Sequence, residues 1–265
     1  MFLLSIFSDY SLFTILSLIV LCFAAGFVDS VIGGGGLIQL PAMLINFPDT
    51  ALPVIFGTNK IASLAGTSMA AFQYAKRIRF NYTILLLVAA FAGAASFAGA
   101  RVVSHINVTA LKPAILIVLI VIAIYTFIKK DLGSVKAKHI SLPQQLLRGA
   151  VMGIIVGFYD GFFGPGTGSF FVLGFVVLLG FEFVEASAYA KLINCMTNIT
   201  ALIVFISQGK FLLEIAVLMA VCNVAGNLVG ATVALRKGNG FVRIFFLIIV
   251  LLMIVRYGYD IYVAY

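Results

Sequence analysis

Long apolar runs alternate with short polar connections along most of the chain. Eight runs are long enough to cross about 30 Å of hydrocarbon as α-helices. They cover residues 11–32, 54–75, 82–103, 109–128, 145–163, 184–207, 211–235 and 241–264. Two shorter apolar runs, 37–48 and 168–181, each follow a cluster of glycines, and either an oblique crossing or a re-entrant half-helix fits them. The pattern predicts an all-α polytopic membrane protein with eight to ten membrane segments.

The composition agrees with this class. The chain is 63% hydrophobic and only 10% charged, which excludes a soluble protein with a polar surface. Its net charge of +8 is compatible with nucleic-acid binding, but the basic residues cluster between apolar runs, at 76–79, 129–130 and 236–237. Such clusters are typical of cytoplasmic loops. We therefore expect a lipid bilayer as the surrounding partner, and no nucleic acid.

Two stretches of the chain are nearly the same in sequence. Residues 26–36 read GFVDSVIGGGG and residues 157–168 read GFYDGFFGPGTG, with 131 residues between the two starts. The same shift aligns Lys60 with Lys191 without a gap. A common register of Asp, Gly and Lys over roughly a hundred residues indicates an internal duplication.

The duplication and the loop charges predict the domain organisation. The first repeat covers 1–130 and the second 145–265, joined by a cytoplasmic loop at 131–144. The basic loop at 76–79 has a nearly uncharged equivalent at 207–210, so equivalent loops face opposite sides of the membrane. We expect two inverted repeats with both termini outside, an architecture that supports alternating access to a midplane site.

The glycine clusters are candidate anion-binding sites. Each precedes a short helix, whose first turn leaves backbone N–H groups unpaired, and glycine lets a ligand approach the main chain. Tight contact between helices is the alternative explanation. The residues concerned are Gly33, Gly34, Gly35 and Gly36 in the first cluster, and Gly164, Pro165, Gly166, Thr167, Gly168 and Ser169 in the second.

Each repeat also has a polar stripe headed by a lysine. Helical spacing places the members of each stripe on one face: Lys60, Ser63 and Thr67 in the first, and Lys191, Asn194 and Asn198 in the second. Because lipid does not accommodate such a face, we expect it to point into the protein and to offer donors to an oxyanion. Alternatively, each lysine reaches the membrane interface or pairs with Asp29 or Asp160.

The two aspartates lie about one helical turn before the glycines. Burial and a nearby lysine act in opposite directions on the protonation of Asp29 and Asp160, so a proton relay is one hypothesis and a structural cap or ion pair is another. We expect no catalytic residue, metal site or cofactor, because His105 and His139 are the only histidines and lie in loops. No feature of the sequence indicates an oligomeric state.

These motifs resemble the sulfite exporter TauE/SafE family, also called the toluene-sulfonate uptake permease (TSUP) family. The resemblance rests on 26–36, on Thr58-Asn59-Lys60, on 157–170 and on 190–194, and extends over essentially the whole chain. It implies a bacterial inner-membrane secondary transporter of sulfite, sulfonates or related sulfur-containing anions, with proton coupling in some members. An anion channel is the main alternative function, and a non-transporting assembly factor is another.

Overall fold

The computed structural model describes residues 10–76, 78–105 and 140–237, together with scattered positions within 115–124 and 248–263. Every regular element among these residues is an α-helix, which confirms the all-α prediction. The helices are α2 (Leu12–Ile32), α3 (Gly36–Asn46), α4 (Leu52–Ala75), α5 (Tyr82–Val103), α7 (Leu142–Phe162), α8 (Thr167–Val177), α9 (Phe183–Ser207) and α10 (Leu213–Lys237). Apart from those scattered positions, the predicted segments 109–128 and 241–264 lie outside the described residues, as does most of the 131–144 loop.

Four of these helices are long and apolar enough to span a membrane, within α2, α5, α9 and α10. Their outer faces carry large apolar side chains that are mostly exposed, such as Phe13, Leu86 and Val221. An apolar exterior of this kind is suited to lipid. The chain is therefore a multi-pass membrane protein.

Helix α4 is long enough to span a membrane but is less apolar than these four helices. Its 24 residues are about 36 Å long at 1.5 Å per residue. Lys60 and its polar neighbours lower the hydropathy of α4, and they are buried because α4 packs against α9 and α10. A helix that is covered by other helices does not need an apolar surface on every side.

The two short predicted segments are observed as the short helices α3 and α8. Each has 11 residues, about 16 Å of helix, which is roughly half the thickness of the hydrocarbon core. Glycines mark the chain reversals before them. Gly33 ends α2 with φ +78°, and Gly166 is the N-cap of α8 with φ +79°, a conformation that favours glycine.

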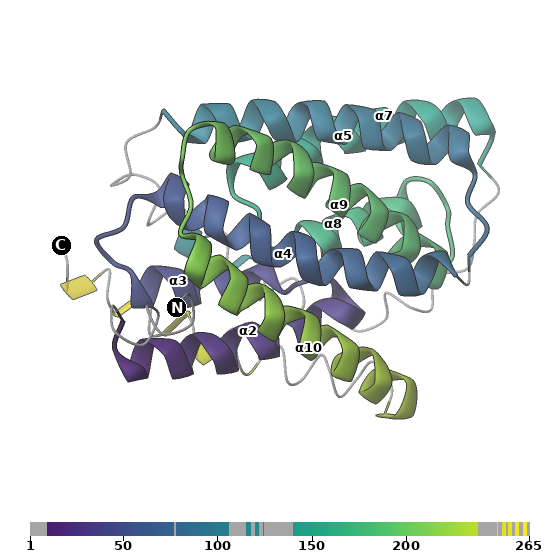
Figure 1. The fold of residues 1–265 in the computed structure, drawn as a ribbon. Coiled ribbons are helices and arrows are strands. Elements are labelled where there is room, and N and C mark those ends of the chain that lie inside the picture. Colours follow the sequence, from purple (N-terminus) through teal and green to yellow (C-terminus); the bar gives the residue numbers. More distant parts are fainter. Residues whose placement is uncertain are drawn as a thin grey trace.

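The long helices form a row in which each packs on the next. The order across the row is α7, α5, α9, α4, α10 and α2, with α5 beside α7 and α2 beside α10 at opposite edges (Figure 1). Helix α3 packs on α2 and α4, and α8 packs on α7 and α9. A shift of 131 residues relates α2 to α7, α3 to α8, α4 to α9 and α5 to α10, with helix starts that agree to within one residue. If each helix is exchanged for its equivalent in the other half, the same helices remain neighbours in the row.

Small residues allow the edge pairs to approach closely. On α7, a Cβ at Gly157 or Gly161 would collide with the backbone carbonyl of Ala92 or Ser96 in α5. Backbone contact between helices through small residues is a common packing mode in membranes. For α5 and α7, whose sequences lie in different halves of the chain, this contact joins the two halves.

Candidate functional site

The two glycine clusters lie against each other at the starts of α3 and α8. The Ser169 N–H donates to the Gly33 carbonyl at 3.2 Å. A Cβ at Gly168 would lie 2.6 Å from the same oxygen, closer than real Cβ contacts. Close contact therefore explains the glycines at positions 33 and 168, as the alternative interpretation predicted.

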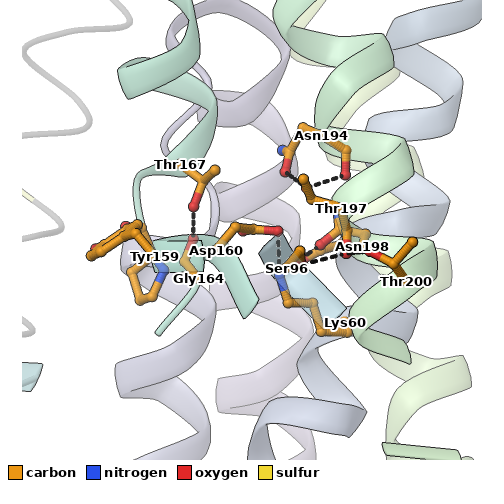
Figure 2. Close-up of polar contacts among 12 residues, drawn as sticks. Lys60, Ser96, Tyr159, Asp160, Gly164, Thr167, Asn194, Thr197, Asn198 and Thr200 are labelled. Carbon is orange, nitrogen blue, oxygen red and sulfur yellow. Dashed lines mark hydrogen bonds and ion pairs between the residues drawn. The ribbon is translucent and has the colours of Figure 1, made fainter. Parts of the chain in front are cut away.

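Side chains hold each turn in place. On the first turn, Asp29 Oδ1 accepts a hydrogen bond of 3.4 Å from the Gly35 N–H, so Asp29 is in part a structural cap. On the second, the Tyr159 hydroxyl donates to the Pro165 carbonyl at 2.6 Å, and Thr167 Oγ1 donates to the Gly164 carbonyl at 2.7 Å (Figure 2).

A small polar cavity lies where these turns meet the stripes of α4 and α9. It leaves about 20 Å³ in which the centre of a water molecule can move, roughly the space of one small polar molecule. Its lining comes from both halves of the chain and consists of Asp29, Gly33, Gly35, Gly36, Gln39, Asn59, Lys60, Ser63, Thr67, Asp160, Gly164, Gly166, Thr167, Gly168, Asn194, Asn198 and Asn223. The lining is thus made of glycine backbone, carboxamides, hydroxyls and two kinds of charge.

Lys60 crosses the cavity to the other half of the chain. Its Nζ lies 2.7 Å from Asp160 Oδ2 and donates a second hydrogen bond, of 3.0 Å, to Asn198 Oδ1. Figure 2 shows the three side chains converging from α4, α7 and α9. Lys60 is only 4% exposed, which excludes the interpretation that it reaches the membrane interface.

Lys191 forms the equivalent pair with Asp29. Its Nζ lies 2.7 Å from Asp29 Oδ2 and also donates to the Asp29 backbone carbonyl. Both lysines are therefore paired with an aspartate of the opposite half, one of the arrangements considered from sequence. The pairs differ in one respect, because Lys60 lines the cavity and Lys191 does not.

The structure brings together most of the residues singled out from sequence. Those of them that do not line the cavity are Gly34, Pro165, Ser169 and Lys191. Sequence reasoning missed Gln39, Asn59 and Asn223. Gln39 had a detectable signal, as a polar residue within the apolar run 37–45. Asn223 had a weaker one, since its counterpart 131 residues earlier is Ala92 and the duplication does not mark it.

The described ranges 10–105 and 140–237, apart from Arg77, contain no group of three His, Cys, Asp or Glu side chains close enough to hold a metal ion. The described residues that line the cavity include no histidine and no cysteine. Its chemistry is that of polar binding by paired charges, carboxamides and helix starts.

Comparison with known proteins gives one family and several relatives. The model of the family described as sulfite exporter TauE/SafE matches residues 18–257. The chain is 36% identical to "Probable membrane transporter protein ORF9" of Sinorhizobium sp over 241 residues, which is 90% of both chains. It is 34% identical to "Probable membrane transporter protein YfcA" of Escherichia coli (strain K12) over 240 residues, 89% of this chain and 86% of that protein.

A third relative has the same kind of name. The chain is 31% identical to "Probable membrane transporter protein" of Haemophilus influenzae over 238 residues, 90% of this chain and 92% of that protein. No solved structure shows a significant match to the chain. All three of these relatives are named as membrane transporters.

Proposed function

Since the chain belongs to the sulfite exporter TauE/SafE family, we propose that it is a secondary transporter that moves sulfite, a sulfonate or a related sulfur oxyanion by alternating access. The family membership confirms the resemblance inferred from the duplicated glycine motif. The relatives also confirm that the chain is a membrane transporter and not an enzyme.

The observation that carries the proposal is the polar cavity at the starts of two half-length helices. Short helices that begin near the middle of a membrane direct the positive ends of their dipoles toward anionic substrate groups. The starts of α3 and α8, where Gly36 and Gly168 line the cavity, form such an environment together with the Lys60 ammonium. The outward faces of the surrounding helices are apolar, so the cavity is a polar site inside a membrane protein.

The proposed mechanism uses two inverted repeats, 1–130 and 145–265. Their support is the matching helix starts and the contact order that is unchanged when equivalent helices are exchanged. The two ion pairs connect the repeats at the cavity. Rocking of one repeat against the other would open the cavity first to one side and then to the other. In this account the chain lies in a bacterial inner membrane with both termini outside.

We infer proton coupling from the pairing of Lys60 with Asp160. An anion that binds the Lys60 ammonium competes with the Asp160 carboxylate, because both need the same positive charge. Protonation of Asp160 removes this competitor and lets proton and anion occupy the site together. The proposal therefore assigns the coupling proton to Asp160. Asp29 keeps a structural role, with Lys191 and the Gly35 N–H as its partners.

Counterflow of labelled sulfite into proteoliposomes tests the proposed function. Vesicles containing the full-length chain and preloaded with unlabelled sulfite should take up labelled sulfite faster than empty vesicles, since a carrier exchanges substrate across the membrane. An anion channel instead gives a steady anion current and no acceleration by preloading. That result would replace the transporter with a channel.

A further inference from the structure

Three carboxamides around the cavity each have one buried polar atom without a partner among the described residues. The atoms are Nε2 of Gln39, Oδ1 of Asn59 and Nδ2 of Asn198. The three side chains are 1%, 6% and 2% exposed, and all three line the cavity. A buried polar atom without a partner destabilises the folded protein, so three such atoms in one cavity point to a ligand that satisfies them.

The orientation of the Asn198 carboxamide follows from its contact with Lys60. Lys60 Nζ lies 3.0 Å from Asn198 Oδ1, and an ammonium group only donates hydrogen bonds. The oxygen of Asn198 must therefore face the lysine, which turns the NH₂ group away from it. The Ser63 hydroxyl donates to Gln39 Oε1 at 3.1 Å, and the NH₂ group of Gln39 has no partner among the described residues. Both side chains thus keep their NH₂ groups unpartnered.

The charges of the cavity do not supply these missing partners. The Lys60 and Asp160 charges compensate each other, and Lys191, outside the lining, compensates Asp29. The cavity is therefore close to neutral before a ligand enters. Its free hydrogen-bonding capacity is at least two NH₂ groups and one carbonyl oxygen, contributed by α3, α9 and α4.

We propose that Gln39 and Asn198 donate hydrogen bonds to the oxygens of the transported anion, and that Asn59 accepts one from an O–H group of that anion. The ligand class is a small, singly protonated oxyanion, of which hydrogen sulfite is an example. This inference rests on the proposed transport function and adds three residues that set its specificity. A sulfonate with no O–H group leaves Asn59 Oδ1 unpartnered, and sites built around a hydrogen bond discriminate strongly against analogues that lack it.

The test measures binding of ³⁵S-labelled sulfite to the purified full-length protein at mildly acidic pH, with methanesulfonate as the competitor that lacks an O–H. The variants Gln39→Met and Asn198→Leu keep the side-chain size and remove the NH₂ donors. Each is expected to weaken hydrogen sulfite binding about 10- to 100-fold, the range for a lost hydrogen bond to a charged ligand. Asn59→Leu should reduce the preference for hydrogen sulfite over methanesulfonate by about 10-fold or more.

Asn227→Leu is the matched control. Asn227 is a fully buried carboxamide of α10 whose two polar atoms also lack partners among the described residues, but it does not line the cavity. The Asn227→Leu variant should bind hydrogen sulfite with the same affinity as the unmodified protein. Thermal unfolding without ligand identifies a variant that fails to fold. If one of the donor variants, Gln39→Met or Asn198→Leu, fails to fold, the other one provides the test.

The outcomes separate the inference from the proposed function. If the unmodified protein shows sulfite counterflow and the folded donor variants bind hydrogen sulfite with unchanged affinity, the inference is wrong and the transport function stands. Equal affinity of the unmodified protein for methanesulfonate and hydrogen sulfite would remove the acceptor role of Asn59. Absence of both binding and counterflow in the unmodified protein would overturn the inference and the proposed function together.

Discussion

Lys60 Nζ lies 2.7 Å from Asp160 Oδ2 although 100 residues separate the two positions in the chain. The pair joins α4 to α7 inside the membrane protein, and Lys191 with Asp29 joins α9 to α2 in the same way. Two buried charges are expensive to remove from water, but losing one partner costs more than losing both. The pairs therefore make clear predictions for stability and for function.

Lys60→Met should destabilise the protein by about 3–5 kcal/mol, because it leaves the Asp160 carboxylate buried without a counter-charge. Thermal unfolding of the purified variant measures the loss. The double variant Lys60→Met with Asp160→Asn removes both charges and should recover most of the stability. A double variant that is as unstable as Lys60→Met would contradict the pairing.

The two ion pairs should differ in their effect on substrate binding. Replacing Lys191 by Met and Asp29 by Asn removes a pair whose lysine lies outside the cavity, and Asn can still accept from the Gly35 N–H. This double variant should lose less sulfite affinity than the double variant at Lys60 and Asp160, because Asp29 lines the cavity but Lys191 does not. The double variant at Lys60 and Asp160 should bind sulfite about 10-fold or more weakly, because the cavity loses the only lysine among its described lining residues and Asn198 loses the contact that orients it. Equal losses in the two double variants would argue against this asymmetry.

Asp160→Asn should separate sulfite movement from proton movement. In the proposed mechanism Asp160 holds the coupling proton, and Asn cannot exchange one. Uptake by the variant should therefore no longer respond to an imposed pH gradient, whereas counterflow without a gradient continues. Asp29→Asn is the control and should keep the response. A pH-gradient response that persists in Asp160→Asn would assign the proton elsewhere.

The contact between the two glycine turns can be tested by a substitution that adds one methyl group. Gly168→Ala places a Cβ 2.6 Å from the Gly33 carbonyl oxygen, so α3 and α8 must move apart. We expect a loss of about 1–3 kcal/mol in stability, typical of overpacking, and slower transport. Gly93→Ala is a helical control, because the atoms nearest to its new Cβ are side-chain atoms of Met196 and Thr200 at 3.3 Å, which can shift. Equal behaviour of the two variants would contradict the tight contact.

Much of the fold could be predicted because hydropathy reports burial in lipid directly. The segment predicted at 82–103 is observed as Tyr82–Val103, and each short helix begins one residue before its predicted range. The apolar pattern was less informative for α4, whose observed start at Leu52 precedes the predicted one. A Pro within the first turn of α4 favours that earlier start, which hydropathy does not report.

The site could be predicted only in part. Helical spacing correctly grouped Lys60 with Ser63 and Thr67, since positions on one face of a helix follow from its period. Spacing along one helix does not specify which helices meet, so the partner of each lysine remained open until the tertiary structure was known. Gln39 was missed for the same reason, because only the packing of α3 against α4 brings it beside Ser63.

Accessibility of a single cysteine in the cavity tests the account most directly. Cys22, Cys195 and Cys222 are free thiols and would be replaced by Ala, after which Ser63→Cys places one thiol in the cavity lining. A membrane-impermeant thiol reagent should reach this cysteine from either side of the membrane, and sulfite should slow the reaction from both sides. The exposed Gln208, outside the cavity lining, provides a control cysteine that should react from one side only and without protection. Reaction of the Ser63 cysteine from one side only, or no protection by sulfite, would contradict a substrate cavity with alternating access.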